Sequence, residues 1–246
     1  MNHFTKKTAG VVLLSALALF TGCSKNDSAG SGSPAAASSG SMQKRYEVKS
    51  GIVHYEPVSM MGVKSSETLY FDDYGRREAR ETVLESDIMG MKSFEHKMEI
   101  TDGDYSISYE IKKTVNGKDE TSREATKTDM KEMREMALMM GKTLDVEELK
   151  KNFDYREEGT EEIAGVTGKK YSVALNKEQP EARVYGVMYK NIVMKSQMGG
   201  ITVIASKIEE NAPVPSSKFD IPAGYSVKEV NLAEEMNRAG NPETQK

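Results

Sequence analysis

The sequence has no tryptophan, a single cysteine and no excess of positive charge. One cysteine cannot form a disulfide within the chain, so the fold must hold through its packed core. The formal net charge of −4 argues against a nucleic-acid-binding protein. A serine nucleophile elbow, a histidine-rich zinc pattern and a glycine-rich phosphate loop are all missing from the sequence. We therefore expect no enzymatic activity, no cofactor, no metal and no nucleic-acid partner.

The N-terminal segment has the layout of a secretory signal. Lys6 and Lys7 precede an apolar run over residues 9–20, which is too short for a membrane-spanning helix. The run ends in Thr21, Gly22 and Cys23, and this arrangement resembles a bacterial lipoprotein signal peptide. The resemblance implies that residues 1–22 are removed and that Cys23 is acylated, including with palmitate. Two or three acyl chains anchor a protein stably in a membrane, whereas one myristoyl chain binds only marginally.

A flexible tether is expected to follow the lipid. Residues 24–42 read SKNDSAGSGSPAAASSGSM and offer almost nothing apolar to bury. As a flexible coil this segment spans roughly 24 Å on average. The residue after the acylated cysteine is Ser24 rather than aspartate. In enterobacterial lipoproteins, a residue other than aspartate at this position implies sorting to the outer membrane. We therefore expect a lipid-anchored protein of the cell envelope that faces the periplasm.

The folded part, predicted over residues 44–230, reads mainly as antiparallel strands. Alternating apolar positions predict strands that are joined by short turns containing Gly, Asp or Asn. The predicted strands cover residues 46–56, 64–71, 76–84, 93–100, 105–112, 155–162, 168–175, 182–189, 192–198 and 201–210. Residues 113–127, with Asn116 and Gly117, are expected to be a loop or an edge hairpin. Residues 231–246 read as a polar C-terminal tail.

The spacing of apolar residues changes from strand-like to helical in the middle of the chain, where two helices are predicted. Asp129 with Glu132 three residues later is a plausible N-terminal cap for a helix that runs to Met140 and ends at Gly141. A second, shorter helix is expected over residues 145–152. Strands before and after these helices predict an α+β domain.

Three short segments share a recognisable pattern: residues 69–75 read LYFDDYG, residues 159–165 read GTEEIAG, and residues 219–225 read FDIPAGY. Together they resemble the LolA/LolB-like domains of bacterial lipoprotein sorting and their uncharacterised relatives. The resemblance implies a curved antiparallel half-barrel sheet with helices covering its open side. It also implies a cavity between sheet and helices that carries a lipid, an acyl chain or a lipoprotein.

Methionine is abundant, with 16 residues. Met130, Met133, Met136 and Met140 lie at helical spacing along the predicted helix, and Met188 and Met194 lie on predicted strands. Because methionine is flexible and polarisable, these six residues are candidates for the wall of an apolar cavity. An ordinary core helix explains the same pattern. A soft-metal site is less well supported, because residues 24–246 contain only His54 and His96, and Met89-Gly90-Met91 is the only Met-x-Met arrangement.

Two functions from different classes follow. The first is a membrane-anchored lipoprotein that binds an apolar ligand or a lipoprotein in a half-barrel cavity. The second is a non-catalytic structural or interaction module of the envelope, with a filled core and no ligand. A carrier needs an open apolar pocket of several hundred Å³. The sequence leaves the oligomeric state open.

Overall fold

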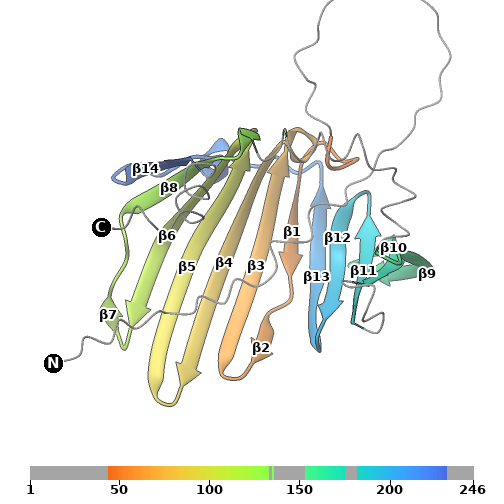
Figure 1. The fold of residues 1–246 in the computed structure, drawn as a ribbon, viewed down its shortest axis with the longest axis horizontal. Coiled ribbons are helices and arrows are strands. Elements are labelled where there is room, and N and C mark those ends of the chain that lie inside the picture. Colours follow the sequence, from red (N-terminus) through yellow and green to blue (C-terminus); the bar gives the residue numbers. More distant parts are fainter. Residues whose placement is uncertain (1–43, 133–134, 136–152, 175–181, 232–246) are drawn as a thin grey trace, which may run out of the picture.

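The computed structural model describes residues 44–132, 135, 153–174 and 182–231. These residues form one mixed sheet of fourteen strands (Figure 1). The strands of the first half are β1 (Gly51–Tyr55), β2 (Val58–Met60), β3 (Val63–Asp72), β4 (Arg77–Ile88), β5 (Met91–Asp102), β6 (Tyr105–Val115), β7 (Lys118–Asp119) and β8 (Glu124–Asp129). The second half supplies β9 (Arg156–Ile163), β10 (Val166–Ala174), β11 (Arg183–Tyr189), β12 (Ile192–Met198), β13 (Ile201–Glu210) and β14 (Ser226–Asn231).

The strand order is β14-β8-β6-β5-β4-β3-β1-β13-β12-β11-β10-β9, with β2 beside β3 and β7 beside β6. Most neighbours are consecutive hairpin partners, as the alternating sequence pattern predicts. The first strand is the exception, because β1 lies between β3 and β13 and so joins the two halves of the sheet. The last strand, β14, pairs with β8 and is parallel to it.

The first half of the sheet carries packed side chains on both faces, and the cluster on one face continues across β13, β12, β11 and β9. Tyr70 lies opposite Ala79 in the β3–β4 pair, so Leu69 and Phe71 point to the other face. On that face Leu69 and Phe71 pack with Val53 and with Tyr46, which precedes β1. On the opposite face Ala79, Met98, Ile100, Tyr109 and Ala125 form the second cluster.

The second cluster is covered by a segment that we call the strap, residues 213–225, which connects β13 to β14. The strap contains the 3-10 helix η3 (Ser216–Phe219). Phe219 is buried among Ala79, Met98 and Ile100, and Val214, Ile221 and Tyr225 pack around them. The Tyr225 hydroxyl donates a hydrogen bond to the Glu110 carbonyl oxygen at 2.5 Å. The strap therefore supplies the apolar side chains that one face of the sheet needs.

The predicted α+β class is wrong for the part of the chain that the structure describes. There, strands account for 67% of the residues and helical turns for 6%, with no helix of seven or more residues. The physical reason is that the strap and the segment around Tyr46 cover the two clusters, where helices were expected. The sheet is large and open rather than a helix-covered half-barrel. Of the predicted helices over residues 129–140 and 145–152, residues 133–134, 136–140 and 145–152 lie outside the described residues.

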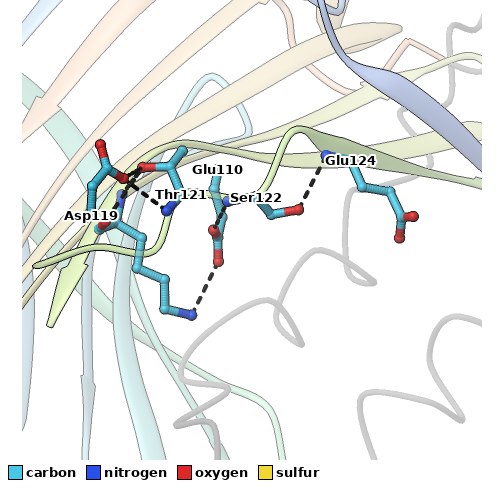
Figure 2. A network of polar contacts seen from close by, with 6 residues as sticks. Glu110, Asp119, Thr121, Ser122 and Glu124 are labelled. Atoms are coloured by element: carbon cyan, nitrogen blue, oxygen red, sulfur yellow. Dashed lines mark hydrogen bonds and ion pairs between the residues drawn. The ribbon is translucent and has the colours of Figure 1, made fainter.

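Each expected strand has a counterpart in the structure, although residues 46–50, expected to belong to the first strand, precede β1. The hairpin expected after β6 is confirmed, whereas β2 and β8 were not expected. Asn116 and Gly117 form the turn between β6 and β7, and a polar network then directs the chain into β8 (Figure 2). The Thr121 hydroxyl donates to Asp119 at 2.5 Å, and the Thr121 side-chain oxygen accepts from the Lys113 backbone N–H at 2.9 Å. Glu110 accepts a hydrogen bond from the Ser122 backbone N–H at 2.9 Å. This network holds the backbone of the edge and is structural.

Candidate functional site

Exposed apolar side chains gather at the tips of two neighbouring hairpins. Met61 and Gly62 form the turn between β2 and β3, and Met89 and Gly90 form the turn between β4 and β5. We call the five apolar side chains at these tips the methionine rim: Met60 (44% exposed), Met61 (87%), Ile88 (46%), Met89 (102%) and Met91 (64%). Contiguous exposed apolar groups of this kind mark binding surfaces in soluble domains.

The two tips are in contact with each other. The Asp87 backbone N–H donates a hydrogen bond to the Gly62 carbonyl oxygen at 2.9 Å. Gly62 also lies close to the Ile88 side chain, because a Cβ placed on it would be 3.7 Å from Ile88 Cγ1. The rim is therefore one surface built from two hairpins. Met198, 38% exposed, ends β12 at the same end of the sheet (Figure 1).

The backbone geometry of the two turns does not favour methionine, which indicates that methionine is present for the apolar side chain that it exposes. Met61 has φ 48° and Gly62 φ 80°, and Met89 has φ 51° and Gly90 φ 81°. Two-residue hairpin turns with positive φ at both positions are type I′, for which Asn-Gly is preferred. The β6–β7 turn of the same chain follows that preference with Asn116 and Gly117. A methionine in the left-handed region gains nothing locally and is strained there.

The rim lies at the opposite end of the sheet from Lys44, where the described chain begins. The Lys44 ammonium lies 3.7 Å from the centre of the Tyr74 ring. Tyr74 belongs to η2 (Asp73–Gly75), the turn between β3 and β4, and its carbonyl oxygen accepts hydrogen bonds from the Arg45 and Tyr46 backbone N–H groups. The full length of β3, ten residues or about 33 Å, separates this turn from the rim (Figure 1).

The charged residues beside the rim are balanced. Lys64 lies opposite Glu85 on β3 and β4, and Asp87 lies opposite Lys92 on β4 and β5. The Lys92 ammonium is 3.8 Å from the Asp87 carboxylate. These two pairs give the flank of the rim both signs of charge, without the basic excess that draws a protein to anionic lipid.

A second constellation, centred on Glu81, fixes the strap to the sheet. The Glu81 carboxylate accepts hydrogen bonds from Lys218 Nζ at 2.7 Å and from the Tyr70 hydroxyl at 2.9 Å, and its other oxygen lies 2.8 Å from His96 Nε2. Burial acts to raise the pKa of Glu81, but the hydrogen bonds from Lys218, His96 and Tyr70 outweigh it and hold the pKa below its ordinary value. This cluster joins η3 to β3, β4 and β5, which is a structural role.

The described residues show no group of His, Cys, Asp or Glu that could hold a metal ion. In the same residues no helix is both long and apolar enough to cross a bilayer. A shallow hollow of about 110 Å³ lies over β9–β12. It is lined by Glu158, Glu161, Lys170, Tyr171, Tyr185, Gly186, Val187, Lys195 and Gln197.

Three of the six candidate cavity residues lie in the described part of the chain. Met188 and Met194 lie on the neighbouring strands β11 and β12, where Met188 is half-buried and Met194 is fully buried in the first cluster. Met130 follows β8, seven strands away from β12 in the strand order, and its backbone N–H donates to the Asp104 carbonyl oxygen at 2.8 Å. Cys23, Met133, Met136 and Met140 lie outside the described residues. The cavity therefore stays a prediction.

Sequence reasoning missed the rim, although a signal for it was present. Met61-Gly62 and Met89-Gly90 each stand between two strand-like runs, where a type I′ turn favours asparagine. An apolar residue in such a position must face solvent at a hairpin tip. The contact between the two tips follows from the pairing of β3 with β4, which places Val63 opposite Ser86.

No family model and no curated protein matches this chain. Among solved structures, it is similar to an uncharacterised conserved protein from Thermus thermophilus, with a TM-score of 0.45 and 8% identity over 76% of this chain and 95% of that one. It is also similar to MucB in complex with MucA(peri), with a TM-score of 0.38 and 14% identity over 76% of this chain and 59% of that one. The MucA/MucB complex of Pseudomonas aeruginosa gives a TM-score of 0.37 and 13% identity, covering 76% and 60%. This chain thus spans about three fifths of the MucB chains it matches.

Proposed function

We propose that this protein is a lipid-anchored interaction module of the cell envelope, in which the methionine rim binds another protein. The observation that carries the proposal is the gathering of five exposed apolar side chains on two touching hairpin tips. Cys23 provides the anchor, residues 24–43 provide the tether, and the sheet is a rigid arm that holds the rim away from the membrane. The outer membrane, with the domain facing the periplasm, is the location that the signal segment supports.

The position of the tether favours a protein over the anchoring bilayer as the occupant. The tether enters the sheet beside Tyr74, and the rim lies about 33 Å further along β3. For the rim to touch the same bilayer, the tether would have to fold back along the whole sheet. The length of the sheet along β3 is greater than the average span of the tether, roughly 24 Å. The balanced charges beside the rim also give no attraction to anionic headgroups.

The side chains suit an apolar segment of a partner, such as one face of an amphipathic helix. Methionine adapts its shape to different apolar surfaces and is enriched where a site must accommodate a flexible partner. Fully burying Met61 and Met89 would contribute about 3–6 kcal/mol before the cost of association. That contribution is enough for two hairpin tips to act as the anchor points of an interface.

A photo-crosslinking amino acid in place of Ile88 tests the proposal in intact cells that make the full lipoprotein. Ile88 belongs to the rim, and Tyr105, 42% exposed at the start of β6 beyond the opposite end of β5, is the matched control position. We expect a discrete adduct with another protein from position 88, no such adduct from position 105, and loss of the adduct when Met61→Ser and Met89→Ser are added.

Besides the absence of any adduct, four results would overturn the proposal. These are equal adducts from both positions, an adduct that survives the two serine substitutions, an adduct to phospholipid, and an adduct of twice the chain's own mass. The third would show a bilayer as the occupant, and the fourth a second copy of this chain. The two serines lie at exposed turn positions, so a folding defect is not expected, and unchanged urea unfolding checks this.

A further inference from the structure

The methionines of the described residues range from fully exposed to fully buried. The only cysteine is Cys23, the predicted site of acylation, so a chain that carries the lipid has no thiol elsewhere to react with oxidants. Among the methionines, Met61, Met89 and Met91 stand in solvent, whereas Met98 and Met194 are 2% and 0% exposed. The readily accessible thioethers of the sheet are thus concentrated on the rim.

We propose that Met61, Met89 and Met91 form a reversible oxidation site whose modification releases the partner of the rim. This inference rests on the proposed function, because it assigns a regulation to the same surface. A peroxide is the oxidant that the chemistry requires. The thioether sulfur attacks one oxygen of hydrogen peroxide, a sulfur–oxygen bond forms and the oxygen–oxygen bond breaks. Sulfur is oxidised by two electrons to the sulfoxide, and the peroxide is reduced to water.

Oxidation changes the surface without changing the fold. A sulfoxide is polar and accepts hydrogen bonds, so a rim that carries it loses the apolar character on which burial against a partner depends. Met61 and Met89 are hairpin-tip residues with 87% and 102% exposure, and the sulfoxide oxygen there remains in water. The two strands of each hairpin keep their hydrogen bonds. The modification therefore affects binding rather than stability, and a methionine sulfoxide reductase with a thiol donor reverses it.

The choice of methionine at the two turns fits this inference. The left-handed position at a type I′ turn penalises methionine, and leucine there would have given an apolar tip with no sulfur. Four of the five rim residues are methionines, on both hairpins. Of the apolar side chains that could occupy these positions, methionine is the one that peroxide converts reversibly into a polar one.

The first experiment measures oxidation at each residue. Cells that make the full lipoprotein are treated with increasing hydrogen peroxide, and peptides are quantified by mass spectrometry. Sulfoxide at Met61, Met89 and Met91 should form roughly tenfold or more faster than at Met98 and Met194, because susceptibility follows exposure. Equal rates at rim and core methionines would overturn the inference, whatever the partner.

The second experiment uses the Ile88 crosslinking position, which contains no sulfur. Peroxide should lower the yield of the adduct roughly tenfold, the factor that corresponds to losing the contribution of one buried methionine. In the matched variant Met61→Leu/Met89→Leu/Met91→Leu, the adduct is compared with that variant's own yield before peroxide, and the ratio should stay near one because leucine has no sulfur to oxidise. Treatment with the reductase and dithiothreitol should restore the parent's adduct.

Equal loss of adduct in the parent and in the leucine variant would overturn the inference and leave the proposed function intact. Absence of any adduct before oxidation would instead overturn the proposed function, and the inferred release of a partner would fall with it.

Discussion

Replacing methionine by asparagine at the two rim turns should make the protein more stable. Met61 and Met89 have φ 48° and 51°, and neither packs against the core. Asparagine tolerates the left-handed region and is the preferred first residue of a type I′ turn. Each substitution should therefore relieve part of the penalty of about 1–2 kcal/mol that an ordinary residue carries there, or roughly 0.5–1 kcal/mol per site.

Together, Met61→Asn and Met89→Asn should raise the free energy of unfolding by about 1–2 kcal/mol. The two tips touch, so the pair is expected to deviate from additivity by up to about 0.5 kcal/mol. Urea unfolding of the lipoprotein in detergent should show a higher midpoint with an unchanged slope. The adduct from position 88 should be lost in the same variant, because the rim is no longer apolar.

The reverse substitution is the internal control. Asn116 has φ 51° in the β6–β7 turn, and its side-chain oxygen accepts a hydrogen bond from the Lys92 backbone N–H at 3.0 Å. Asn116→Met should cost about 1–2 kcal/mol, since it loses both the turn preference and this bond. A double asparagine variant that is less stable than the parent would show that the methionines support the hairpins, and would refute the view that they are present for binding.

Three further predictions concern the strap, its ionic contact and the anchor. Phe219→Ala should lower the free energy of unfolding by about 3–5 kcal/mol in urea, because the ring is buried in the second cluster; a cost below about 1 kcal/mol would mean that the strap does not close this core. The lowered pKa of Glu81 stabilises the fold at pH values above the ordinary carboxyl range, and this contribution is lost as the pH falls through the folded-state pKa. Glu81→Gln should therefore lower the free energy of unfolding at about pH 6.5 and make its decline toward about pH 3 less steep. An unchanged decline in the variant would count against the contact. Cys23→Ser should leave an uncleaved precursor or a soluble exported form, and a mature-sized variant that still enters the detergent phase would refute the anchor.

The hairpins were predictable because each depends on neighbouring residues. Alternation predicts the strands β3, β4, β5 and β6, and the turn residues predict the β3–β4 and β5–β6 hairpins. The Met89-Gly90 turn between β4 and β5 lacks the preferred turn residue and was not predicted. The strand order was not predictable, since β1 finds β13 more than 150 residues away, as the pair His54 and Glu209 shows. β14 was missed because its six residues are mostly exposed and lack an alternating pattern.

The expectation of covering helices failed for a physical reason. A sheet face needs apolar cover, but the sequence does not show which segment supplies it. The proline-containing strap, with Phe219 and Ile221, looks like a break between strands, yet it packs across Ala79 and Ile100. For the site, the methionine pattern drew attention to residues 130–140, whereas the exposed methionines of the sheet lie in hairpin turns or at the strand ends beside them.

The central position of β1 has a consequence for how the chain folds. Strands β3 to β6 can pair in sequence order as soon as they are made, but the joint between the halves requires β13, which ends at Glu210. Loops of this length close slowly, and until then β1 presents an unpaired edge. A chain exported in extended form therefore spends a period with an open, aggregation-prone edge, while its N-terminus is already held at the membrane by the predicted lipid. We expect export chaperones to matter more for this protein than its modest length suggests.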